Sequence, residues 1–311
     1  MDNKEALYSK PLPSSRSGAF YNTFPYPTKI SPEAIAVYIA CSTNPGDLVL
    51  DAFAGSGSTG VAALLCEHPT ERMRKITKDL NVTPVWGARN AVLYEIGTYA
   101  SFAIKTILSR LSSREFTIAV DSFLKKAQDL VGGLYEAIDL AGDTGTIRYV
   151  IWSEVLECPS CHSEISYFEH GTSRDPVRFK DEIVCPYCKK VHHVEEMPFT
   201  TEEHYDRLLH KQVSRKKRVP AWIYGTTNGY NWDRQATEAD AAYIAQIEST
   251  CDVDDVPQEI QWGELHRAGY HYGITHLHHF YTARNYIVMS KLWKLAETYP
   301  EKISDALKLL L

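Results

Sequence analysis

Apolar residues along the first 145 positions follow two patterns. Spacings of three and four residues predict helices, whereas short continuous apolar runs between turn residues predict buried strands. The predicted helices lie after Ser31, from Val61, over 100–111 and over 120–138. The predicted strands are residues 48–51 and 91–96, and a glycine-rich segment, 52–60, follows the first of them. The order helix, strand, glycine loop, helix, strand is typical of a parallel α/β sheet.

The pattern changes near residue 145. Residues 146–152 are β-rich and lead into a pair of cysteines, and short strands are predicted at 165–168 and 177–180. The segment from 282 to 311 has a helical pattern, with Thr282 as its cap. The sequence therefore predicts three regions, 1–145, 146–200 and 201–311, of which the last is basic, aromatic and mostly helical.

Composition narrows the class of protein. Hydrophobic residues make up 44% and charged residues 23% of the 311 residues, as in an ordinary globular chain. The net charge of −6 argues against general coating of nucleic acid but allows a local basic groove. No apolar run is long enough to span a membrane, and the polar N-terminus lacks the apolar core of a secretory signal.

Four of the seven cysteines have the spacing C-x2-C-x23-C-x2-C; they are Cys158, Cys161, Cys185 and Cys188. Each CxxC turn points two thiolates at one ion, and four thiolates complete a tetrahedral Zn²⁺ site that has no open position. We therefore expect a structural zinc in a ribbon at 146–200, and a reducing cytoplasm as the compartment. The alternative is two unrelated pairs without metal. The other cysteines, Cys41, Cys66 and Cys251, are scattered.

The glycine-rich segment, D-A-F-A-G-S-G-S-T-G from Asp51, indicates a cofactor site. Its glycines let the backbone turn tightly and approach a ligand, and the following helix adds free N–H groups. Glu95, at the end of the next strand, is placed to bind ribose hydroxyls, with residues 68–90 as an insertion before it. The alternative is an ordinary strand-to-helix turn. No P-loop lysine follows the glycines, so ATP hydrolysis is disfavoured.

This segment closely resembles the motif D-P-F-x-G-S-G-T-T of amino-methylating DNA methyltransferases, with Ala52 in place of proline. Residues 24–32, F-P-Y-P-T-K-I-S-P, are similar to the H-P-T-x-K-P element of the same enzymes, although the histidine is absent. Together with the four cysteines, these motifs make the chain resemble adenine-specific DNA methylases that carry a zinc ribbon. The resemblance implies S-adenosylmethionine as cofactor, DNA as partner and an α/β fold with a Rossmann-like core.

The resemblance also implies roles for individual residues of the cofactor region. Four residues of the loop would line the methionine part of S-adenosylmethionine: Phe53, Ala54, Gly55 and Gly57. Glu95 would bind the ribose, and Thr28 and Lys29 would approach from the N-terminal arm. Asp51 would position the cofactor or bond the loop's own N–H groups, and these two roles are compatible. For Lys29 the alternative is a solvated surface side chain.

A second motif of that family, D-P-P-[YFW], holds the target base, and it is missing here. The chain contains 15 prolines, and no two of them are adjacent. The resemblance therefore implies an incomplete Rossmann-like core, in a truncated chain or one half of a split enzyme. We expect the 311 residues alone to be inactive, and a further polypeptide to supply the catalytic residues, which the sequence does not identify.

A basic run from Arg207 to Arg218 contains six lysines and arginines and no acid. Its last four basic residues are the predicted phosphate contacts with DNA: Arg215, Lys216, Lys217 and Arg218. The alternative is a solvated helix face. Four histidines also lie close in sequence, and packing or surface roles are favoured for them over metal binding: His271, His276, His278 and His279.

Two functions of different classes are consistent with these motifs. The first is a DNA methyltransferase acting on an amino nitrogen, with adenine favoured and cytosine still possible as the target. Methylation of a carbon atom is not indicated, because neither Cys41 nor Cys66 follows a proline. The second is a non-catalytic zinc-ribbon module that binds nucleic acid. An RNA methyltransferase differs from the first only in its substrate.

Overall fold

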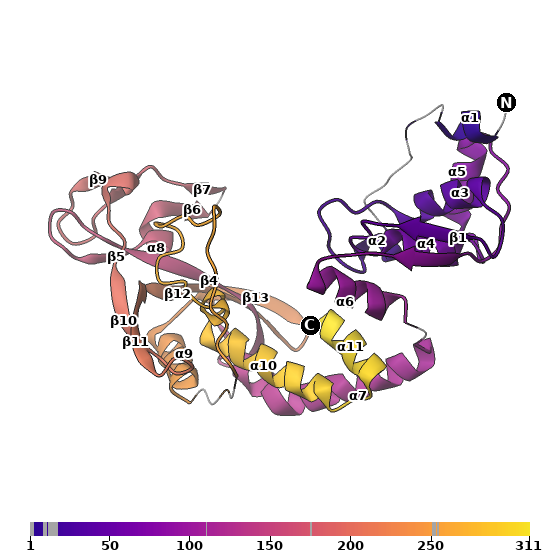
Figure 1. Ribbon diagram of the computed structural model, residues 1–311. Helices are drawn as coiled ribbons and strands as arrows, with labels where there is room; N and C mark the ends of the chain where they lie inside the picture. The colour runs from indigo at the N-terminus through magenta and orange to yellow at the C-terminus, as the bar shows by residue number, and fades with distance from the viewer. Residues whose placement is uncertain are drawn as a thin grey trace. The chain divides into compact units, whose positions relative to one another are not determined.

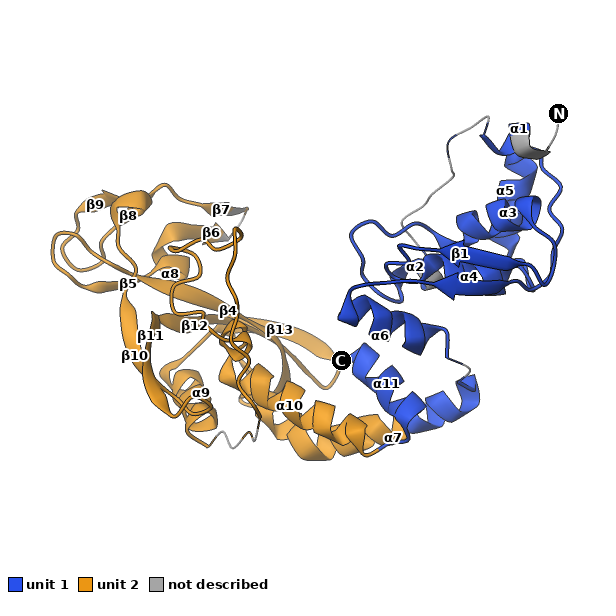
Figure 2. Ribbon diagram, in the orientation of Figure 1, with its two compact units in different colours: residues 1–119, 299–311 blue, residues 120–298 orange. Residues whose placement is uncertain are grey.

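The computed structural model describes residues 3–8, 11, 18–109, 111–174, 176–250, 253 and 255–311. They form two compact units, which we call unit 1 (residues 1–119 and 299–311) and unit 2 (residues 120–298), as Figures 1 and 2 show. Cys251 and part of the N-terminal arm lie outside the described positions. Helices and a short parallel sheet build unit 1, whereas antiparallel strands dominate unit 2.

Unit 1 contains a two-stranded parallel sheet, β1 (Leu48–Asp51) and β2 (Asn90–Leu93), with Leu48 opposite Asn90 and Asp51 opposite Leu93. The parallel pairing predicted for these two segments is therefore present. The helices of this part of the chain are α1 (Asn3–Tyr8), α2 (Ala19–Asn22), α3 (Pro32–Ser42), α4 (Ser58–Leu65), α5 (Glu71–Leu80), α6 (Thr98–Ile107), the start of α7 (Ser113–Val131) and α11 (Glu301–Leu310).

Two helix starts show how local chemistry acts in unit 1. Ser31 precedes α3 as predicted, but its hydroxyl is buried and makes no capping hydrogen bond; its carbonyl accepts the N–H groups of Ala34 and Ile35. Helix α5 lies inside the segment that we expected to be an insertion, and Thr70 caps it by accepting the Met73 N–H at 3.2 Å. Its apolar residues recur at three- and four-residue spacing and enter the core.

The core of unit 1 covers only one face of the sheet. Helices α3, α4 and α5 pack through small residues and Met73, and Val49 of β1 packs against this cluster. Leu48 and Leu50 point to the opposite face, because side chains alternate along a strand, and they are 65% and 66% exposed. The expectation of a fully buried strand is therefore wrong for one of its faces.

Unit 2 is built on an antiparallel sheet in the order β13-β12-β4-β3. Its strands are β3 (Glu136–Ile138), β4 (Thr144–Glu157), β12 (Arg218–Thr227) and β13 (Tyr230–Gln235), and β5 (Glu164–Ser166) pairs with the far end of β4. Three hairpins accompany it: β6 (Thr172–Arg174) with β7 (Val177–Phe179), β8 (Glu182–Val184) with β9 (Val191–His193), and β10 (Thr201–Asp206) with β11 (Lys211–Lys216). The helical elements are η1 (Gly132–Tyr135), α8 (Tyr167–Gly171), η2 (Val194–Glu196), α9 (Glu238–Ser249), η3 (Leu277–Phe280) and α10 (Ala283–Glu297).

The division into three regions differs from these units. The expected boundary at 145/146 falls inside β4, and β12, from the third region, pairs with β4 over most of its length. The third region was expected to be mostly helical, but it opens with four antiparallel strands. The basic run begins just after β10, follows β11 and ends at the first residue of β12, so the alternative of a helix face is also wrong. The fold is thus mixed helix and sheet, with mostly antiparallel sheets.

Candidate cofactor and metal sites

Asp51 fixes the first half of the glycine loop where β1 ends. One carboxylate oxygen accepts the backbone N–H of Phe53 at 3.0 Å, and the other accepts the hydroxyl of Thr59 at 2.6 Å. The structural role that was considered for this acid is therefore present. Because Thr59 lies in the first turn of α4, the two bonds tie the loop to the helix that follows it.

Backbone conformation explains the two glycines. Gly55 and Gly57 have φ angles of 53° and 77°, in the left-handed region that glycine adopts without strain. A Cβ atom on Gly55 would lie 2.9 Å from the ring of Tyr26, and one on Gly57 would lie 3.0 Å from Ile104. The N-terminal arm therefore packs directly on the loop through Tyr26, a contact that the sequence did not indicate.

Glu95 lies at the same loop, as expected for the acid after the second strand. Its carboxylate accepts the N–H of Gly55 at 2.8 Å through one oxygen and the N–H of Gly97 at 2.8 Å through the other. The N–H of Ala54 donates to the carbonyl of Tyr94, which joins the loop to the end of β2. Each carboxylate oxygen can accept more than one hydrogen bond, so Glu95 can still bind a hydroxyl group.

The N-terminal arm brings Lys29 close to the loop. Its ammonium group donates to the carbonyl of Phe24 at 3.0 Å, and burial lowers the pKa of Lys29 below its usual value. Lys29 is therefore not a fully solvated surface lysine, whereas Thr28 is exposed. A cavity of about 340 Å³ in unit 1 is lined by Lys29, Ser56 and Ser58 among others. Phe53, whose ring was expected to pack on the cofactor, is 92% exposed, so none of the described residues covers it.

The four cysteines of the two CxxC pairs converge in unit 2. The Sγ atoms of Cys158 and Cys188 lie 3.7 Å apart, and those of Cys161 and Cys185 lie 3.6 Å apart. A tetrahedral zinc with bonds of about 2.3 Å has sulfur–sulfur edges of about 3.8 Å. The group can therefore hold a metal ion, and its donor set suits Zn²⁺.

A histidine that the sequence reasoning missed joins this cluster. The Nε2 atom of His192 lies 3.4 Å from the Sγ atom of Cys158. Its position four residues after Cys188 was the available signal. An N–H group directed at a metal-bound thiolate offsets part of its negative charge, as second-shell donors do at metal sites.

The four basic residues expected to contact DNA already have acidic partners. Arg215 lies 2.7 Å from Glu202, Lys217 lies 2.6 Å from Glu164, and Lys216 and Arg218 share Glu154 at 3.5 and 3.2 Å. Lys216 is also only 8% exposed. These ion pairs neutralise part of the positive charge, and DNA contact by the four residues stays a prediction.

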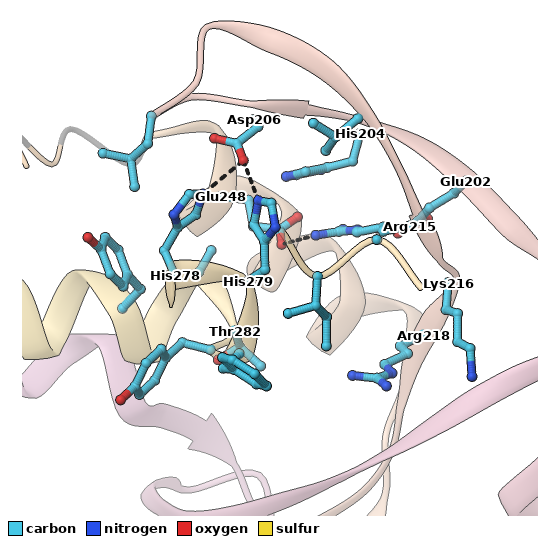
Figure 3. Close-up of a pocket in the computed structure, with 18 of the residues that line it drawn as sticks. Glu202, His204, Asp206, Arg215, Lys216, Arg218, Glu248, His278, His279 and Thr282 are labelled. Atoms are coloured by element: carbon cyan, nitrogen blue, oxygen red, sulfur yellow. Dashed lines mark hydrogen bonds and ion pairs between the residues drawn. The ribbon is translucent and has the colours of Figure 1, made fainter. Parts of the chain in front are cut away.

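His278 and His279 form a second cluster with Asp206, within a cavity of unit 2 (Figure 3). Both imidazoles lie within 2.8 Å of one carboxylate oxygen of Asp206. The packing role favoured for these histidines is therefore present, but its acidic partner was not anticipated. His271 lies elsewhere and stacks on Trp262 at 4.3 Å.

No helix among the described residues is both long enough and apolar enough to cross a lipid bilayer. Residues 5–69 match the family model described as DNA methylase, which represents methylases acting on N6 of adenine or N4 of cytosine. The matched segment includes β1, the glycine loop and α4. Comparison with curated proteins and with solved structures found no match. Residues 5–69 are therefore similar to the N6/N4 DNA methylases, in agreement with the resemblance of the loop and the arm.

Proposed function

We propose that unit 1 binds S-adenosylmethionine and that the chain serves in the methylation of an exocyclic amino nitrogen of DNA, with adenine as the target. The match of residues 5–69 to DNA methylases supports this. The observation that carries most weight is the meeting of Asp51, Gly55 and Glu95 at the carboxyl ends of two parallel strands. Cofactors bind at this edge of parallel sheets, beside the glycine loop.

The residues of unit 1 have separable tasks in this proposal. Glu95 accepts hydrogen bonds from ribose hydroxyls with the lone pairs that Gly55 and Gly97 leave free. Lys29 uses one of its three donors on Phe24, so the others can reach the methionine carboxylate. The exposed ring of Phe53 packs against the cofactor. S-adenosylmethionine, held by Glu95, Lys29 and Phe53, would supply the methyl group to an amino nitrogen and would leave as S-adenosylhomocysteine, with the proton of that nitrogen released.

We propose that the cysteine cluster holds a structural zinc ion. The sulfur–sulfur distances of 3.6 and 3.7 Å suit a tetrahedral site, and four thiolates leave no position open for a substrate. The surrounding core is small and consists mainly of Leu156, Ile165, Ile183 and Met197. A metal ion would therefore contribute much of the stability of this segment.

The acceptor base requires residues that these 311 positions do not identify. No two prolines are adjacent, so the D-P-P-[YFW] motif is absent from them. The uncovered apolar face of β1, with Leu48 and Leu50 about two thirds exposed, supports a further polypeptide segment that packs there. We propose that this segment, in the same chain or in a partner, supplies the base-binding motif.

Titration of the 311-residue protein with S-adenosylmethionine in a calorimeter tests the proposal. One binding site, which S-adenosylhomocysteine blocks, is expected. A non-catalytic nucleic-acid module has no use for a methyl donor, so absence of binding by the folded protein would favour that alternative. Methylation of RNA in preference to DNA, once the missing motif is supplied, would reassign the substrate.

A further inference from the structure

A cavity of about 300 Å³ in unit 2 has no role in the function proposed above. It lies between the β10–β11 hairpin, the segment that contains η3, and the start of α10 (Figure 3). Its volume is at the lower end of the range of small-molecule pockets. Aromatic side chains form much of its wall, and several of them are about half exposed, among them Tyr205, Tyr272, Phe280 and Tyr281.

Of the four basic residues predicted to contact DNA, three line this cavity and one does not. Arg215, Lys216 and Arg218 line it, but Lys217, between two of them, does not. Lys217 pairs instead with Glu164 at 2.6 Å. Arg218 is 46% exposed and uses one nitrogen on Glu154, so most of its five N–H donors remain for a ligand. Three acids, Glu202, Asp206 and Glu248, line the same cavity. Arg215 pairs with the two glutamates and Asp206 bonds the two histidines, so the basic group of this run that offers unused donors to a ligand there is Arg218.

The Asp206 cluster resembles a metal site but has the wrong hydrogen bonding for one. The backbone N–H of Thr275 donates to Nδ1 of His279 at 3.1 Å. A neutral imidazole has one N–H group and one lone pair, so the proton of His279 is on Nε2, which donates to Asp206 at 2.7 Å. Nε2 therefore has no lone pair for a metal ion. In a metal-bound histidine the nitrogen that does not bind the metal normally donates a hydrogen bond, whereas Nδ1 of His279 accepts one.

Asp206 is instead the anchor of one wall of the cavity. Its second oxygen accepts the N–H of Leu209 at 2.9 Å, and its first oxygen accepts Nε2–H from both histidines. The three side chains are at most 11% exposed. This arrangement holds η3 against the end of β10, so this wall of the cavity is preformed by hydrogen bonds within the protein.

Aromatic walls and a guanidinium group together recognise a ring that carries a phosphate. Tyr281 and Tyr286 line the cavity with their ring centres 6.2 Å apart, and aromatic rings of this kind stack on nucleobases. Arg218 lines the same cavity, and so do Thr282 and Ala283 at the positive end of α10. Guanidinium groups bind phosphate through paired N–H donors.

We propose that this cavity binds a nucleotide, with its base against Tyr281 and Tyr286 and its phosphate at Arg218. The nucleotide is either free or one unit of a DNA strand that leaves the base stack. The second source rests on the proposed function, whereas the first does not.

The test measures how tightly the full chain binds each of the four deoxynucleoside 5′-monophosphates. Their affinities are compared with those of the matching nucleosides and of inorganic phosphate. At least one monophosphate should bind about tenfold more tightly than its nucleoside and than phosphate. Arg218→Met should weaken that monophosphate about tenfold, and Arg218→Lys less. Tyr281→Ala should weaken the binding of nucleotide and nucleoside alike, by about tenfold.

A duplex that contains 2-aminopurine tests the DNA source, because extrusion of that base raises its fluorescence and stacking on Tyr281 changes it.

Matched controls separate the cavity from general charge and from the cofactor site. Lys217→Met and Tyr230→Ala remove a cation and an exposed ring that do not line the cavity, and they should leave the binding of deoxynucleoside monophosphates unchanged. Equal weakening by Lys217→Met would overturn the proposal, as would equal affinity for phosphate alone or no binding from either source. Binding of Mn²⁺ or Zn²⁺ that His278→Ala abolishes would make the cluster a metal site instead. S-adenosylmethionine binding by the same variants is expected to be unchanged, so loss of the proposed function and loss of this pocket give different results.

Discussion

Individual carboxylates hold loops and neighbouring segments in place through hydrogen bonds. Asp51 and Glu95 each use both oxygens on the glycine loop or its neighbours, so the loop is held before any ligand arrives. Asp206 does the same for the wall of the cavity in unit 2. Preformed sites of this kind lower the cost of ordering side chains when a ligand binds.

Glu95→Ala is expected to weaken S-adenosylmethionine binding by about 1.5–3 kcal/mol, the range for a hydrogen bond to a charged group. The change removes the acceptor for the ribose and also for Gly55 and Gly97. Calorimetry measures the affinity, and thermal unfolding shows whether the loop alone is disturbed. Glu115→Ala, on the exposed surface of α7, is the control. Unchanged affinity in Glu95→Ala would reject the ribose role.

Unit 2 is expected to lose stability in acid through the Asp206 cluster. Burial lowers the pKa of His279, so below about pH 6.5 the unfolded state binds more protons and stability falls. Burial alone would raise the pKa of Asp206, but the hydrogen bonds from His278 and His279 lower it well below its usual range. Its contribution is therefore present above about pH 4 and is lost as the pH falls further.

Thermal unfolding followed by circular dichroism between pH 3 and 8 measures this dependence. Asp206→Ala should lower the free energy of unfolding by about 2 kcal/mol near neutral pH, because three partly buried N–H groups, of Leu209, His278 and His279, lose their acceptor. Asp121→Ala, an exposed change on α7, should have little effect. A wild-type midpoint that is flat between pH 8 and 5 would contradict the role of His279.

At the scale of single elements, β1 and the cysteine hairpins depend on something beyond their own packing. Val49 of strand β1 is partly buried against the helices, whereas Leu48 and Leu50 are about two thirds exposed. The hairpin of β8 and β9 has three residues in each strand and a small core around the cysteines. Elements this short have too little core for independent stability.

Removal of zinc by a chelator is expected to unfold the segment around Cys158–Cys188 while β12 and β13 keep their protection. The reason is that the thiolates replace a hydrophobic core there. Hydrogen exchange measures the change, and metal analysis should find one zinc per chain. Cys41→Ser should keep the zinc, and Cys185→Ser should lose it. Protein without zinc and with four freely reactive thiols would contradict the assignment.

Replacing both Leu48 and Leu50 by lysine is expected to change the free energy of unfolding by only about 0.5 kcal/mol, since both side chains are already in water. The same change should reduce self-association of the 311-residue protein, because it removes an apolar face. Sedimentation velocity at several concentrations measures this. Ile118→Lys, 60% exposed on α7, is the control. A large loss of stability would mean that this face is covered in solution.

At the scale of the whole molecule, the candidate donor site and the cysteine cluster belong to different compact units. The residues proposed for the donor lie in unit 1, whereas the D-P-P-[YFW] motif that would hold the acceptor nitrogen in line with the methyl group is absent from the 311 residues. Because methyl transfer needs both partners held in line, much of its rate depends on alignment.

We therefore expect no methylation of DNA by the 311 residues alone. Activity should appear when a polypeptide with D-P-P-[YF] is supplied, in the same chain or separately. Transfer of a radiolabelled methyl group to unmodified genomic DNA measures this, and digestion of the product to nucleosides distinguishes N6 of adenine from N4 of cytosine. Turnover by the isolated chain would show that another set of residues binds the base.

The sequence by itself predicted those features that residues close together in the chain produce. The CxxC spacing predicted the convergence of four sulfurs, because each turn brings two cysteines together without help from distant parts of the chain. The strand, glycine loop and helix around Asp51 form one continuous segment, and the next strand pairs with β1 as expected. The amphipathic helix α5 is harder to recognise, because its ten residues carry only three buried apolar side chains among many charged ones.

Tertiary structure alone decided which distant residues meet. Along β11 and β12, charged and partly buried residues alternate too irregularly to predict strands. The position of β12 depends instead on its pairing with β4, more than 60 residues earlier in the chain. That pairing places Arg218 opposite Glu154, and Lys216, from the neighbouring strand β11, reaches the same carboxylate. Asp206 meets His278 and His279 only because the chain returns after 72 residues. Contacts of this kind depend on the packing of whole elements, which a local pattern of residues does not specify.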